Sequence, residues 1–133
     1  MGRPSTIHVL ATTPLDTHAA LTTASQLAGW LGAMLRVIVP EVVSYGLRVE
    51  SPAPDPTTVA DVYRMMASRM GIVADVRLCV CRRKSDVYHV LLPQRSVIVM
   101  GGRRRRWPWS NATDRTARTL ENLGHHVFVV ERG

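Results

Sequence analysis

The sequence has no apolar run that approaches the ~18 residues a membrane-spanning helix needs. Its first residues also lack the basic start and apolar stretch of a signal peptide. The chain has 133 residues, which is near the commonest size for one domain. We therefore expect a single domain over residues 1–133, working in the cytoplasm and without a membrane partner.

Cysteine is scarce, and so are groupings that could carry catalysis. Cys79 and Cys81 are one residue apart in a strand-like run, where a disulfide would close almost no loop. A metal or redox pair normally has two residues between its cysteines, and the five histidines form no spaced ligand set. The sequence also shows no nucleophile–base–acid set and no paired carboxylates. We expect two buried thiols, no metal site and no enzymatic activity.

Lysine is nearly absent: Lys84 is the only lysine among 17 basic residues, and the formal net charge is +7. A basic balance can indicate nucleic acid, an anionic membrane or a phosphate ligand as partner. Four of the charges lie in one run, Arg103–Arg106, and three more lie in Arg82–Lys84. The preference for arginine is typical of a GC-rich genome, so the charge alone selects no partner.

The apolar pattern alternates between strand-like and helix-like segments. We expect strands at Thr6–Ala11, Met34–Val39, Ala74–Cys81, Ser96–Met100 and Val127–Val130. Helices are expected from Asp16 or Thr17, as N-cap, to Leu31, then at Thr57–Met70, Val87–Leu92 and Ala112–Leu123. Pro40 is expected to end the second strand, and the proline-rich segment Glu41–Pro56 is expected to be a loop.

This order predicts a three-layer α/β/α domain with five parallel strands, because strands alternate with helices and read as continuously apolar. Ile7–Ala11 and Ser96–Met100 are the most apolar strands, so we place both near the centre of the sheet.

The segment Ser96–Gly102, an apolar strand that ends in Met-Gly, resembles the fourth strand of universal stress proteins. The loop, helix and last strand that follow it also resemble that family, as do the first strand and helix. The resemblance covers nearly the whole chain and implies the fold named above. It also implies a homodimer through the last strand, Val127, Phe128, Val129 and Val130.

Nucleotide-binding members of that family resemble one another in a G-x-x-G-x9-G-[S/T] motif, whose glycines bring backbone N–H groups to the phosphates. This sequence keeps Gly101, but Arg104 stands at the second glycine, and Thr113-Asp114 stand near the final pair. Thr12 or Thr13 takes the place of the acidic residue that ends the first strand. The motif is therefore degenerate, and we expect no ATP binding of the family type.

Two main interpretations of the loop Arg103–Trp109 remain open, beside a third in which its arginines and tryptophans bind nucleic acid. In one, its guanidinium groups bind ATP or another phosphate-containing ligand, with Trp107 and Trp109 stacking on a base. In the other it is a solvated basic loop, and the protein is a non-catalytic binding or regulatory module. The candidate ligand residues are Thr12, Thr13, Gly101, Gly102, Arg103, Arg104, Ser110 and Thr113. We also expect that an anionic molecule or a partner protein can bind at this loop.

Overall fold

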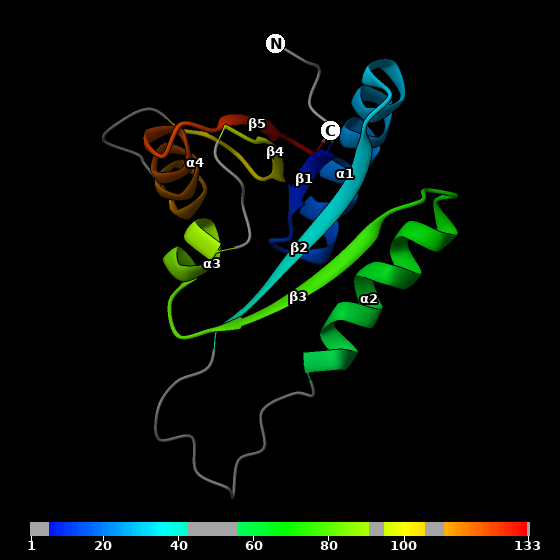
Figure 1. The fold of residues 1–133 in the computed structure, drawn as a ribbon, viewed down its shortest axis with the longest axis horizontal. Coiled ribbons are helices and arrows are strands. Elements are labelled where there is room, and N and C mark those ends of the chain that lie inside the picture. Colours follow the sequence, from blue (N-terminus) through cyan, green and yellow to red (C-terminus); the bar gives the residue numbers. More distant parts are fainter. Residues whose placement is uncertain (1–5, 43–55, 91–94, 106–110, 133) are drawn as a thin grey trace, which may run out of the picture.

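A computed structural model describes residues 6–42, 56–90, 95–105 and 111–132 of the chain (Figure 1). Its elements alternate in chain order: β1 (Thr6–Leu10), α1 (Pro14–Leu31), β2 (Met34–Val42), α2 (Pro56–Arg69), β3 (Asp75–Cys81), α3 (Lys84–Val90), β4 (Val97–Gly101), α4 (Ala112–Asn122) and β5 (His126–Val130). The five strands form one parallel sheet in the order β3-β2-β1-β4-β5. The predicted three-layer α/β/α fold is confirmed, with β1 and β4 both inside the sheet. None of the described helices is long and apolar enough to cross a membrane.

Each face of the sheet carries its own apolar core. On one face, α1 and α2 cover the side chains of Ile7, Val9 and Val37. On the other face, α3 and α4 cover Leu10 and Ile98. The strands must be apolar on both sides to be covered in this way, which is why their sequence reads as continuous hydrophobic runs.

The predicted end of the second strand is wrong. Strand β2 does not end at Pro40 but continues to Val42, so the expected loop begins later than Glu41. Ala11 N–H donates to the carbonyl of Ile38, so the backbone groups of Ile38, and of Pro40 two residues on, face β1. Because β1 has ended at this height, the missing N–H of Pro40 costs no ladder hydrogen bond.

The first helix is capped by Thr13, and the prediction of Asp16 or Thr17 as cap is wrong. The Thr13 hydroxyl accepts from the N–H of Asp16, and Pro14 takes the first helical position, where its lacking N–H is harmless. Thr17 is buried and its hydroxyl accepts from the N–H of Thr12. The third helix begins at Lys84, three residues before the predicted Val87.

Candidate functional site

The carboxyl ends of β1, β4 and β5 meet at one edge of the sheet, where parallel α/β sheets usually bind ligands. A cleft of about 630 Å3 opens there, lined by Asp16, Gly102, Arg103, Asn111, Thr113, Glu131 and Arg132. Of the predicted ligand residues, Gly102, Arg103 and Thr113 line this cleft. Ser110 lies outside the described residues, as do Arg106, Trp107 and Trp109.

Close packing explains the two glycines at the end of β4, Gly101 and Gly102. A Cβ on Gly101 would overlap the backbone carbonyl of Asp16, so α1 can begin against this strand only if residue 101 is glycine. Gly102 has φ +152, and a Cβ there would lie 2.5 Å from the hydroxyl of Thr113. The Thr12 hydroxyl donates to the carbonyl of Gly101 and joins the ends of β1 and β4. These residues therefore build the cleft wall.

Asp114 organises the loop that follows. Its carboxylate is 2% exposed and accepts from the N–H of Arg105 with both oxygens, at 2.8 and 2.9 Å. It also accepts from the N–H of Asn111 at 3.0 Å, and the side chain of Asn111 accepts from the N–H of Asp114. This reciprocal pair is a capping box at the start of α4.

The pKa of Asp114 is lowered on balance. Burial acts to raise it, but the N–H donors of Asn111 and Arg105 lower it more. The guanidinium groups of Arg104 and Arg118 act in the same direction. Asp114 therefore carries its negative charge at neutral pH, at the place where the loop and the helix start present their N–H groups.

Two of the described arginines of the loop, Arg103 and Arg104, have carboxylate partners for their side chains. The two terminal nitrogens of Arg104 donate to Glu121 at 3.1 and 3.4 Å. The Nε of Arg103 lies 3.8 Å from Glu131. Across the cleft mouth, Arg132 lies 2.7 Å from Asp16. Such exposed pairs stabilise little, but each one offsets a charge that would otherwise attract an anion.

Sequence reasoning missed four residues of the cleft: Asp16, Asn111, Glu131 and Arg132. Two signals could have found them. Asn111 and Asp114 have the spacing of a capping box, which marks the first turn of α4. Glu131 and Arg132 directly follow β5, and polar residues after a parallel strand gather at the carboxyl edge.

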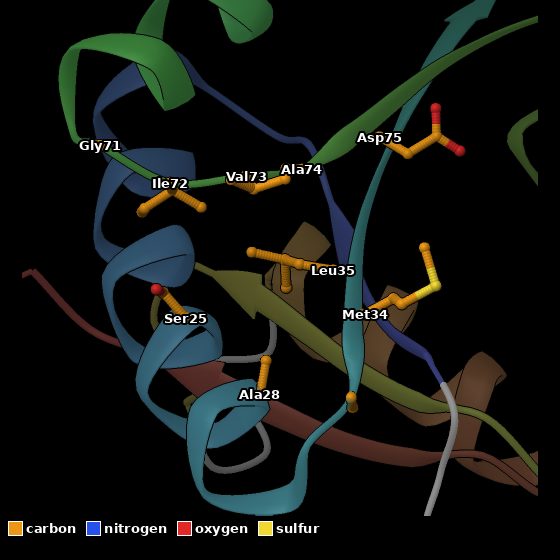
Figure 2. A pocket seen from close by; sticks show the side chains of 10 residues that line it. Ser25, Ala28, Met34, Leu35, Gly71, Ile72, Val73, Ala74 and Asp75 are labelled. Atoms are coloured by element: carbon orange, nitrogen blue, oxygen red, sulfur yellow. The ribbon is translucent and has the colours of Figure 1, made fainter.

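A second hollow, of about 530 Å3, lies at the opposite end of the sheet, between α1 and the starts of β2 and β3 (Figure 2). Ala28, Leu35 and Ile72 face it, while the side chains of Met34 and Asp75 point away from it (Figure 2). Its lining is mainly apolar, and no group of His, Cys, Asp and Glu among the described residues could hold a metal ion. We therefore place the candidate site at the carboxyl edge.

No model of a known protein family and no curated protein matches the sequence. Solved structures do match. A universal stress protein crystallised in complex with cAMP has 14% sequence identity and a TM-score of 0.59, over 97% of this chain and 98% of that chain. A universal stress protein from Archaeoglobus fulgidus has 14% identity and a TM-score of 0.58, over 94% and 92%. A member of that family from Burkholderia pseudomallei has 18% identity and a TM-score of 0.54, over 95% of each chain. The chain thus has the universal stress protein fold, as its sequence resemblance implied.

Proposed function

We propose that this protein is a non-catalytic regulatory module with the universal stress protein fold, and that the loop after β4 does not hold ATP. The observation that carries the proposal is the carboxylate of Asp114. It accepts the N–H groups of Arg105 and Asn111, which are the kind of donors that a phosphate would need. A phosphate entering here would meet a buried negative charge.

We propose no catalysis because the acidic side chains that line the cleft are occupied by ion pairs. Its two acidic side chains, Asp16 and Glu131, are each in an ion pair with an arginine. Each of these carboxylates is therefore already engaged by a charged partner. We propose cytoplasmic action and binding of a partner protein in place of turnover.

We also propose that two copies pair through β5. This strand lies at the edge of the sheet, and it carries no charged residue between Val127 and Val130. Phe128 is 51% exposed on it. An uncharged edge with an exposed aromatic side chain favours pairing with a second strand.

Calorimetric titration of ATP into the protein tests the main proposal. We expect no binding at micromolar concentrations at physiological salt. The matched variant is Arg103→Gln, which removes a loop guanidinium that pairs with Glu131 and not with Asp114, and it should behave like the wild type. Stoichiometric ATP binding by the wild type would contradict the proposal.

The alternative function is binding of a phosphate-containing ligand through the Arg103–Trp109 loop. It is favoured by the cleft itself, which brings Gly102, Arg103 and Arg132 together, and by the structural neighbour crystallised with cAMP. Titration with cAMP tests it. Under this alternative, the wild type binds cAMP, the affinity falls steeply as the salt concentration rises, and Arg103→Gln abolishes the binding. Without cAMP binding by the wild type, this alternative is wrong.

A further inference from the structure

His8 is a buried histidine in the middle of the sheet. It lies in β1 and is 2% exposed, and neither of its ring nitrogens has a hydrogen-bond partner among the residues that the structure describes. In the sheet register it stands between Arg36 of β2 and Ile98 of β4. A buried imidazole without a partner is costly, and adding a proton to it would cost more.

His125 is the second buried histidine, and it joins the starts of β4 and β5. Its ring Nδ1 accepts from the backbone N–H of Ser96 at 3.1 Å. The next residue, His126, donates its N–H to the carbonyl of Ser96 at 3.0 Å. Ser96 stands just before β4, so both of its backbone groups bond to the segment that opens β5.

The charged groups around this pair oppose protonation. Burial lowers the pKa of His8 to about 4, with Arg36 and then His125 adding to the effect. Burial also lowers the pKa of His125. The carboxylate nearest to Arg36 is Asp75 of β3, 3.3 Å from its Nε, which also pairs with Arg77.

The other described elements on this face carry two further carboxylates, Asp86 in the first turn of α3 and Asp114 in the first turn of α4, and neither contributes to the pKa shift of His8. The side chains of β4 are apolar. On α3, Tyr88 is buried and its pKa is raised, so it stays neutral in acid as well. On α4, Ala117 and Leu120 face the core, and Glu121 is bound to Arg104.

We propose that His8 and His125 form an acid-sensitive latch, which releases the start of β5 from β4 when the two imidazoles take up protons from the solvent. In neutral His125 the proton sits on Nε2, because Nδ1 accepts from Ser96. A proton added to Nδ1 places an N–H against the N–H of Ser96, and this hydrogen bond is lost. A second charge on His8 adds repulsion beside Arg36.

The release is local, because β5 is an edge strand whose only neighbour among the described strands is β4. The other end of the same pair is held separately: Gly102 N–H donates to the carbonyl of Val130 at 3.0 Å. The latch therefore predicts that β5 opens at its amino end while its carboxyl end stays paired. The inference is independent of the proposed function.

Amide hydrogen exchange, measured by NMR on the whole protein and corrected for intrinsic rates, tests the latch. Between pH 7 and pH 4 we expect the protection factors of Ser96 and His126 to fall about tenfold relative to that of Gly102. In His125→Asn the side-chain oxygen can still accept from Ser96 but does not titrate, so the fall should disappear. The matched control is His126→Asn, at an exposed neighbour, which should keep the wild-type fall.

Two results would overturn the latch. One is an equal fall at Ser96 and Gly102, which means that the whole domain unfolds. The other is an unchanged fall in His125→Asn. If that variant does not fold, the imidazole resonances of the wild type decide: the titration midpoint of His125 must coincide with the midpoint for loss of Ser96 protection, and separate midpoints contradict the proposal.

Discussion

His8 should make the free energy of unfolding of this domain depend on pH. In the unfolded chain its imidazole takes up a proton near pH 6.5, whereas the buried imidazole resists until about pH 4. Between these values the unfolded chain binds more protons than the folded one, so stability rises with pH. The contribution is complete above about pH 6.5 and is lost progressively as the pH falls toward 4.

The magnitude follows from the difference between the two pKa values. At about 1.4 kcal/mol for each pH unit, it amounts to about 3 kcal/mol. This is a large share of the ~5–15 kcal/mol that holds a typical domain together. His125, whose pKa is lowered by burial, acts in the same direction.

Urea unfolding followed by circular dichroism at pH 7.5, 6, 5 and 4 measures this dependence. In His8→Leu an apolar side chain replaces the imidazole, and we expect the loss of stability toward pH 4 to shrink by about 3 kcal/mol. The exposed control, His126→Gln, should follow the wild type. Asp75, whose pKa is lowered chiefly by its hydrogen bond from Arg77, titrates alike in all three proteins. Parallel curves for wild type and His8→Leu would refute the reasoning.

Three further predictions concern the cleft wall and the sheet edge. Gly101→Ala should destabilise the domain by at least about 2 kcal/mol, because the new Cβ overlaps α1. Gly29→Ala, which places a Cβ in open space on the same helix, should stabilise the domain by about 1 kcal/mol. Thermal unfolding compares the two variants, and similar unfolding midpoints would disprove the packing argument. Asn111→Ala should lose about 1 kcal/mol through the broken capping box, and an unchanged urea midpoint would contradict that role. Phe128→Lys should convert the proposed dimer to a monomer in light scattering, and a wild type that is already monomeric at all concentrations removes the dimer proposal.

The fold could be predicted because strands that are buried on both faces of a sheet consist mainly of apolar residues. The strands of Ile7 and Ile98 are apolar at nearly every position, and the structure places them inside the sheet. The end of β2 was not predictable from Pro40 alone. Whether a proline breaks a strand depends on whether a neighbour faces its nitrogen, and that is set by the length of β1.

The candidate site was predictable only in its local part. The position of the loop after Gly101 follows from the strand, and the acidic first turn of α4 is visible at Asp114. The ion pairs are long-range: Arg104 meets Glu121 from 17 residues away, across a turn of chain that the sequence pattern does not fix. A run of arginines in sequence therefore suggests free positive charge, although the side chains of Arg103 and Arg104 are paired in space.

The strand order also determines how the sheet can form while the chain is being synthesised on the ribosome. The first strand made, β1, is the centre, and β2 and β3 add outward on one side of it. Its opposite edge must wait until β4 emerges near residue 101, and β5 then closes beside β4. No strand is ever inserted between two that are already paired, so the sheet can grow as the chain is synthesised. The cost is a nascent half-sheet whose apolar central edge stays open for the time needed to translate α2, β3 and α3. During that interval the unpaired edge of β1 can associate with other chains, and binding by a chaperone would protect the nascent chain most at this stage.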